Sequence, residues 1–335
     1  MGSLPFFPGA ASDRLVGIAK LAAEGHALDS GHKVEFFSLP VRSILNRCTS
    51  NRKLPFAWTI NPYRGCEFAC KYCYARYTHE FMEIRDFDEF EHKIFVKDEA
   101  AWLLRRDLKK VKAGEEIAIG AATDPYQPAE RRHGVTRSLL EEFSRHTGFT
   151  VGIVTKSNLV LRDIDVLQEV GKRNRVAVHV TVTTLNADLA RILEPRAPRP
   201  DLRLEAVKKL NQAGIRAGIN CAPVLPGITD KPTDLEALVK AAAEAGAPGL
   251  FANSLFLKPC SRAVFLPFVA KHFPDLKPLY ERMYGERDFG SPAYRQQLSA
   301  LMAKFKKKYG IGSRGPRGPI RESREPEAFG QMTLF

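Results

Sequence analysis

The middle of the chain alternates short apolar runs with longer amphipathic segments, and this alternation restricts the fold more than any other feature. The segments between the runs, for example 89–112, carry apolar residues at helical spacing and charged residues on the other face. Such alternation is typical of βα units wound into a parallel sheet. The apolar runs predict six strands, at 58–63, 116–121, 150–155, 176–183, 216–222 and 250–257.

Six parallel strands with right-handed crossovers favour an open, partial (β/α)6 TIM-like barrel over a complete eight-stranded one. In either α/β fold, the functional side chains gather at the carboxyl ends of the strands. We expect residues 55–260 to form this core and 1–54 to form an N-terminal extension. We expect a helical segment at 261–309 and a flexible basic tail at 310–335, where glycine and proline interrupt a chain with few apolar residues.

The charge balance favours a polyanionic partner. The 335 residues include 51 Lys and Arg against 38 Asp and Glu, a formal net charge of +13. Nucleic acid is the first such partner to consider, with DNA favoured. No apolar stretch is long enough to span a membrane, and the first residues do not have the pattern of a secretory signal. We therefore expect a cytoplasmic protein with no membrane partner.

Three of the six cysteines lie within eight residues, in the segment 61–76 (NPYRGCEFACKYCYAR). Cys66, Cys70 and Cys73 have the spacing C-x3-C-x2-C. Three thiolates from one loop can hold three corners of a [4Fe-4S] cluster and leave the fourth iron open to a small molecule. Two alternatives are a zinc site, completed by His79 or His92, and purely structural thiols.

Segment 61–76 resembles the signature of the radical S-adenosylmethionine (SAM) enzymes. Together with segments 122–130, 155–167 and 194–215 it is similar to the branch related to spore photoproduct lyase, a DNA repair enzyme. The resemblance covers roughly residues 55–260. It implies a partial (β/α)6 barrel of the radical SAM type, a [4Fe-4S] cluster held by the three cysteines, and reductive cleavage of SAM to methionine and a 5′-deoxyadenosyl radical.

The resemblance also indicates where SAM would bind. It suggests contacts from polar residues at strand ends and in the segment 194–215. Each has an ordinary alternative role: a helix cap or turn, a solvated or phosphate-binding lysine, a strand-forming threonine, or an ion pair. The predicted SAM-binding residues are Thr123, Asp124, Lys156, Thr183, Thr184, Glu194 and Arg203.

Two residues are candidates for hydrogen transfer. The resemblance suggests this role for Tyr74, whereas Tyr72 is expected to pack in the core. The hydrogen-donating cysteine of spore photoproduct lyase falls in the segment that matches 120–124, which contains no cysteine here. The same final step on thymine dimers is therefore not implied. Cys221 is a possible substitute, and a buried apolar thiol is the alternative interpretation.

The chain ends in Gln331-Met332-Thr333-Leu334-Phe335, which resembles the Gln-x-x-Leu-Phe peptide that binds the bacterial sliding clamp. An amide and two apolar side chains on a flexible tether suit a docking peptide. The alternative is an apolar end that packs against the barrel. The lysines at 304–308 are expected either to contact phosphates or to form a solvated face.

Three functions are consistent with these features. The first is a radical SAM enzyme that repairs or modifies a DNA base, which would need a reductant such as flavodoxin or ferredoxin. The second is a radical SAM enzyme that modifies RNA or protein. The third is a non-catalytic, metal-stabilised nucleic-acid-binding protein. The sequence does not indicate which base or lesion would be the substrate.

Overall fold

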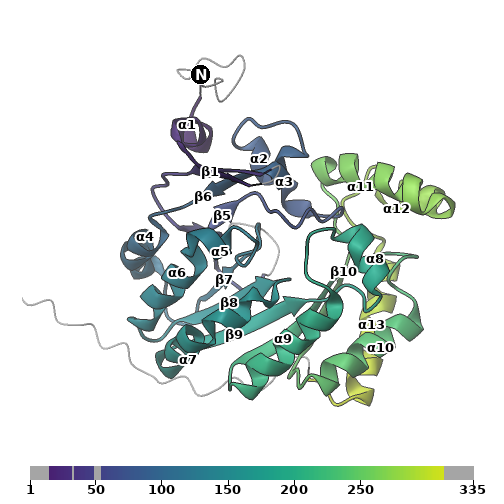
Figure 1. The fold of residues 1–335 in the computed structure, drawn as a ribbon. Coiled ribbons are helices and arrows are strands. Elements are labelled where there is room, and N and C mark those ends of the chain that lie inside the picture. The colour runs from purple at the N-terminus through teal and green to yellow at the C-terminus, as the bar shows by residue number, and fades with distance from the viewer. Residues whose placement is uncertain (1–14, 32–33, 49–53, 313–335) are drawn as a thin grey trace, which may run out of the picture.

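The structure is a computed structural model, and it describes residues 15–31, 34–48 and 54–312 (Figure 1). The proposed clamp-binding residues Gln331, Leu334 and Phe335 and most of the expected basic tail lie outside the described residues. None of the helices within the described ranges is long and apolar enough to cross a membrane.

A seven-stranded sheet forms the centre of the molecule. Its order is β11-β10-β9-β8-β7-β4-β3, and the six strands from β4 to β11 run parallel. Strand β3 (Leu45–Arg47) pairs antiparallel with β4 at one edge. The parallel strands are β4 (Trp58–Ile60), β7 (Glu116–Ile119), β8 (Thr150–Thr155), β9 (Arg175–Thr181), β10 (Arg216–Val224) and β11 (Leu250–Ser254).

These six strands overlap the six predicted ranges, and they follow one another across the sheet in chain order. The two edge strands are β3 and β11, so the sheet is an open, partial barrel rather than a closed one. Helices joining the strands cover its outer face (Figure 1). They are α4 (Ala100–Asp107), α6 (Val135–Ser144), α7 (Ile164–Arg173), α9 (Pro200–Gln212) and α10 (Pro232–Glu244). Helix α8 (Ala187–Leu193) also lies between β9 and β10, but it packs with residues of the segment 66–75 rather than in the main core.

The main core lies between the sheet and these helices. On β9 and just beyond it, Val178, Val180 and Val182 are fully buried in this core. Because side chains alternate along a strand, Thr181 and Thr183 point to the opposite face, the inside of the barrel. The helical side is therefore apolar and the inner side carries polar groups.

A second, four-stranded sheet lies beside the barrel, in the order β1-β2-β6-β5. It contains β1 (Ala27–Gly31), β2 (Val34–Ser38), β5 (Tyr63–Arg64) and β6 (Lys93–Val96). The sequence predicted one amphipathic segment over 89–112, and this prediction was wrong in part. Residues 93–96 form a strand because Ile94, Phe95 and Val96 are fully buried and their backbone pairs with β2.

Of the remaining helices, α1 precedes β1, α2 and α3 follow β5, α5 lies between β7 and α6, and α11 to α13 follow β11. Helices α11 and α12 lie side by side near the last strand (Figure 1). The elements are α1 (Gly17–Glu24), α2 (Tyr77–Glu80), α3 (Glu89–His92), α5 (Glu130–His133), α11 (Pro259–His272), α12 (Lys277–Tyr284) and α13 (Pro292–Lys308), with short 3-10 helices η2 (Tyr74–Arg76), η3 (Leu108–Lys110), η4 (Asn158–Asp163) and η5 (Pro274–Leu276).

Candidate active site at the carboxyl ends of the strands

The cysteine loop, residues 65–73, begins directly after β5 with a turn that only glycine accommodates. Gly65 has a φ of +82°, and a Cβ atom there would lie 2.6 Å from the carbonyl oxygen of Lys93. Both the positive φ and the close backbone favour glycine. The backbone N–H of Cys66 then donates to the carbonyl of Phe90 at 2.9 Å, which starts the loop against α3.

Polar side chains from the segment after β7 hold the cysteine loop. The hydroxyl of Thr123 donates to the carbonyl of Gly65 at 2.6 Å, and the amide of Gln127 donates to the same carbonyl at 3.2 Å. The Gln127 carbonyl accepts from the Glu67 backbone at 2.9 Å. The Glu67 carboxylate accepts in turn from the N–H of Ala129 at 2.6 Å. Hydrogen bonds from the segment after β7 therefore hold the loop in this conformation.

The three thiols of this loop are well shielded. Cys66 and Cys70 are buried and Cys73 is partly exposed. Burial raises the pKa of Cys66 well above its usual value, with further increases from Asp124 and the other two cysteines. Burial likewise raises the pKa of Cys70 to about 12. Without metal the Cys66 and Cys70 thiols are protonated, so cluster assembly must displace their protons.

This donor set suits a cluster better than a single ion. Within the described residues, no three His, Cys, Asp or Glu side chains converge on one metal position. A zinc ion needs four such donors at one centre, whereas each thiolate of a [4Fe-4S] cluster binds a different iron. Two buried thiols and one partly exposed thiol on a single loop therefore fit three corners of a cluster.

The two histidines considered for a zinc site have other partners. His79 contacts the carbonyl of Lys93 at 3.2 Å, and its ring packs on Phe90 and Phe95. Burial lowers the pKa of His79 to about 3. His92 contacts the guanidinium of Arg196 at 3.3 Å. The structure does not bring either histidine into a metal-binding group with the cysteines.

Asp124 joins the ends of β7 and β8. One of its carboxylate oxygens accepts from the Thr155 hydroxyl at 2.6 Å and from the Tyr126 N–H at 2.9 Å. The other accepts from the backbone N–H of Lys156 at 2.7 Å. Burial raises the pKa of Asp124, which these hydrogen bonds partly offset. In the structure, Thr123 and Asp124 thus use their polar groups to hold the loops around the cysteines.

Glu194 and Arg203 form a buried ion pair at 2.5 Å, with both side chains almost fully excluded from solvent. The Tyr72 hydroxyl, within the cysteine loop, donates to the Glu194 carboxylate. Thr183 donates to the same carboxylate at 3.2 Å, and Arg203 donates to the carbonyl of Thr181 at 3.1 Å. The pair therefore connects the cysteine loop to the end of β9.

Lys156 lies beside this ion pair. Its ammonium is 5.7 Å from the centre of the Tyr72 ring. Burial would lower the pKa of Lys156, but nearby Cys70 and Glu194 raise it overall, so the side chain is charged. The structure brings Lys156, Thr183, Glu194 and Arg203 together. Thr184 is half-buried, and its hydroxyl accepts from the Asn186 N–H at 3.1 Å, which is a local turn contact.

The two residues considered for hydrogen transfer differ in position. Tyr74 is 39% exposed, follows Cys73 directly, and donates its hydroxyl hydrogen to the carbonyl of Ala121 beyond β7. Cys221 is fully buried in the main core together with Ile219 and Val224. This is the helical side of β10, so the structure does not bring Cys221 to the cysteine loop.

Sequence reasoning missed three residues that support the site. Gln127, described above, is the first of them. The second is Asn61, whose side-chain oxygen accepts from the N–H of Ala122 at 2.7 Å. The third is buried Lys97, which donates to the backbone carbonyl of Asn61 at 2.7 Å. Asn61 and Gln127 lie in two of the four segments on which the family resemblance rests, so a signal for them was present. Lys97 follows a strand that the sequence did not predict.

The Gly65 turn gives a direct test of the loop geometry. We expect Gly65→Ala to cost about 1–3 kcal/mol at the loop and to reduce bound iron and sulfide per chain after anaerobic reconstitution. Gly114→Ala is the matched control, because Gly114 has nearly the same φ, +83°, but no atom within 4 Å of an added Cβ. Equal iron content in both variants would contradict this account of the turn.

The chain is similar to a known protein family and to other protein sequences. Residues 60–240 match the model of the Radical SAM superfamily. An uncharacterized protein of Mycobacterium tuberculosis is 32% identical over 304 residues, which cover 90% of this chain and 88% of that protein. An uncharacterized protein of Methanocaldococcus jannaschii is 29% identical over 199 residues, covering 59% of this chain and 71% of that protein.

Solved structures of spore photoproduct lyase have a similar fold. A double mutant of that enzyme with bound AdoMet and dinucleoside spore photoproduct matches with a TM-score of 0.64 and 16% identity. The match covers 89% of this chain and 86% of the lyase chain. A single mutant of the lyase matches with a TM-score of 0.61 over 82% of this chain and 79% of that one, also at 16% identity.

Proposed function

This chain belongs to the radical SAM superfamily, and we propose from that premise that it cleaves SAM reductively in order to repair or modify a base in DNA. The observation that carries the proposal is the arrangement of Cys66, Cys70 and Cys73 on one hydrogen-bonded loop at the carboxyl ends of the strands, beside the charged side chain of Lys156. A binding protein with a structural metal would need neither an incomplete ligand set nor a half-buried cation next to it.

The three cysteines would hold the cluster, and SAM would bind at the iron that they leave open. When bound, the cluster and SAM together supply one-electron cleavage of a C–S bond, which yields the 5′-deoxyadenosyl radical. Lys156 has no ion-pair partner among the described residues and would meet the carboxylate of SAM. Thr183 and Thr184 would contact SAM from the end of β9.

The other predicted residues would act by positioning. Asp124 holds the backbone of Lys156, and Thr123 holds the carbonyl of Gly65. Glu194 and Arg203 fix Tyr72 within the cysteine loop. These contacts fix the position of the cluster ligands relative to the SAM site, because each joins the cysteine loop or a neighbouring segment to a different strand end.

Two observations support DNA as the substrate. The net charge of +13 favours a polyanion. The fold is that of spore photoproduct lyase, which has been solved with a dinucleoside photoproduct bound. Tyr74 is our candidate for hydrogen transfer, since it is half-exposed next to Cys73. With no cysteine at 120–124 and Cys221 in the core, we do not propose the final step of that lyase.

The decisive experiment has two stages. Anaerobically reconstituted protein is first assayed with dithionite for 5′-deoxyadenosine, which only a SAM-cleaving enzyme produces. It is then incubated in separate reactions with ultraviolet-irradiated DNA, undamaged DNA, RNA and protein, and the products are analysed by mass spectrometry. A change in a DNA base supports the proposal. Cleavage of SAM with modified RNA or protein instead would exclude DNA as the substrate, and the absence of any cleavage would leave a non-catalytic binding protein.

Flavodoxin or ferredoxin is the reductant we propose for the cell.

The terminal peptide gives a separate prediction about recruitment. We propose that Gln331, Leu334 and Phe335 bind the sliding clamp, as their spacing suggests. We expect deletion of residues 331–335 to remove clamp binding in surface plasmon resonance, while SAM cleavage stays unchanged. The matched control replaces Met332 and Thr333 by alanine and should still bind. Equal clamp binding by the intact and deleted chains would refute this recruitment.

A further inference from the structure

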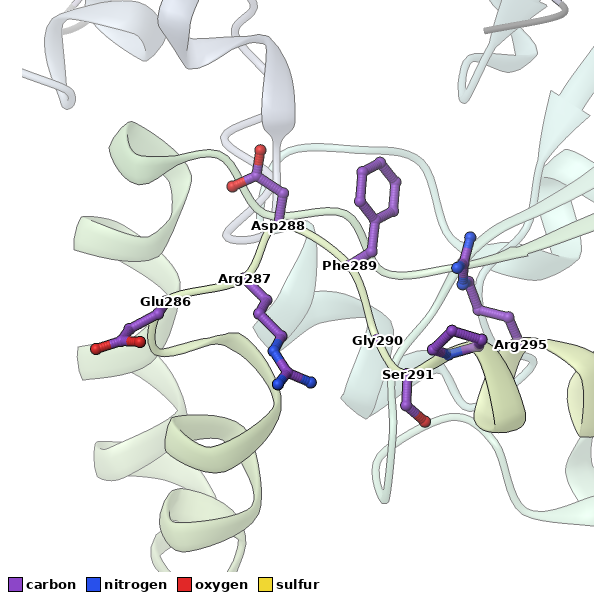
Figure 2. A pocket seen from close by; sticks show the side chains of 8 residues that line it. Glu286, Arg287, Asp288, Phe289, Gly290, Ser291 and Arg295 are labelled. Atoms are coloured by element: carbon purple, nitrogen blue, oxygen red, sulfur yellow. The ribbon is translucent and has the colours of Figure 1, made fainter.

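A shallow hollow lies beside the last strand of the barrel, in the connection between α12 and α13 (Figure 2). Its volume is about 500 Å³, within the range of sites that take a small ligand. Neither the cysteine loop nor any predicted SAM-binding residue lines it. The lining residues are Glu286, Arg287, Asp288, Phe289, Gly290, Ser291, Pro292 and Arg295.

The hollow is joined to the candidate active site by a row of aromatic rings. The backbone N–H of Leu257 donates to the carbonyl of Asp288 at 2.9 Å, which ties the connection to the end of β11. Phe289 stacks on Phe256 with ring centres 4.5 Å apart. Phe256 in turn contacts Tyr74, at 6.0 Å between ring centres. Because Tyr74 directly follows Cys73, these two ring contacts lead from the hollow to the cysteine loop.

The hollow also presents two exposed guanidinium groups. Neither Arg287 nor Arg295 has a carboxylate partner among the residues that the structure describes. The Arg295 guanidinium lies 5.7 Å from the centre of the Phe289 ring. The nearby carboxylate of Asp288 is paired with Arg262 at 3.0 Å. Figure 2 shows Glu286 pointing away from Arg295, so the side near the aromatic ring is cationic.

We propose that this hollow binds single-stranded DNA, at a nucleotide next to the reacting base. A base would stack on the surface formed by Phe289 and Arg295, and phosphates would pair with Arg287. Aromatic rings interleaved with guanidinium groups are the usual binding surface for single strands, because every base has a π face and every linkage carries a negative charge. A paired duplex hides its base faces. The inference rests on the proposed DNA substrate and adds how the strand is held.

The test measures DNA affinity in the full chain with its cluster. Binding of a short fluorescein-labelled oligodeoxynucleotide is followed by anisotropy at physiological salt. We expect Phe289→Ala and Arg295→Ala each to weaken binding by about tenfold, the usual loss for one stacking contact. Arg287→Ala should weaken binding and reduce its dependence on salt. Arg173→Ala is the matched control, because Arg173 is an exposed arginine at the opposite ends of the strands, where α7 leads into β9.

A second measurement separates this inference from the proposed function. SAM cleavage without DNA should be the same in all four variants, since none changes the cysteine loop or the SAM-binding residues. If the unmodified protein does not cleave SAM, the proposed enzymatic function is wrong, and the affinity measurements then test DNA binding by the hollow independently. Unchanged DNA affinity in Arg295→Ala and Arg287→Ala, both surface changes that should fold, would overturn the hollow as a DNA site. A loss of affinity only for RNA of the same sequence, or only for peptides, would also overturn the hollow as a DNA site.

Discussion

Replacing Cys70 by alanine is expected to abolish formation of 5′-deoxyadenosine. The loss should exceed the roughly 10- to 100-fold that follows from changing residues around a metal ligand, because a ligand itself is removed. Cys70 is one of the two buried thiols of the loop, and the pair formed by Cys66 and Cys73 cannot hold a cluster that needs three corners. Cleavage is measured by chromatography of anaerobic reactions, with iron and sulfide content measured in parallel.

Cys48→Ala is the control for this prediction. Cys48 is also a free cysteine, but it lies just beyond β3 and its backbone pairs with Ala57 rather than with the cysteine loop. We expect the Cys48 variant to keep the cluster and full SAM cleavage. Cleavage retained by the Cys70 variant would refute the ligand assignment, and with it the proposed function.

Replacing Arg203 by methionine is expected to destabilise the protein by about 3–5 kcal/mol, the usual cost of leaving a buried charge without its partner. Arg203 and Glu194 are each 1% exposed, so water cannot solvate the Glu194 carboxylate once the guanidinium is gone. The carboxylate also holds the Tyr72 hydroxyl. The variant should therefore lose cluster content as well as stability. Urea unfolding of the metal-free protein measures the first effect, and iron content measures the second.

The double variant Glu194→Gln with Arg203→Met provides the control. Removing both charges takes away the unpaired carboxylate, so much of the lost free energy of unfolding should return. The Arg199→Ala variant removes an exposed arginine that pairs with exposed Asp201 at 2.7 Å, and it should change stability by less than about 1 kcal/mol. An unchanged urea midpoint for Arg203→Met alone would show that the pair does not stabilise the fold.

Local sequence patterns were enough to predict the parallel sheet and the cysteine loop. Strand 150–155 was predicted with its observed limits, because a buried parallel strand is a continuous apolar run and its ends are marked by polar residues. The cysteine spacing and the glycine before it could be predicted as well, because both are patterns within a few neighbouring residues. Residues 93–96 were misread, since their apolar side chains fit a helix equally well until a distant strand pairs with them.

The sequence by itself determined the succession of βα units and the three-thiolate loop, because periodicity and spacing act over a few residues. Only the tertiary structure decided which polar groups meet. It brought Gln127 into contact with the cysteine loop and directed Cys221 towards the helices. It also paired Glu194 with Arg203, in contact with Tyr72, and stacked Phe289 on Phe256. These contacts join segments far apart in the chain. Their formation depends on how strands pair and which way each side chain faces, and no local pattern records either.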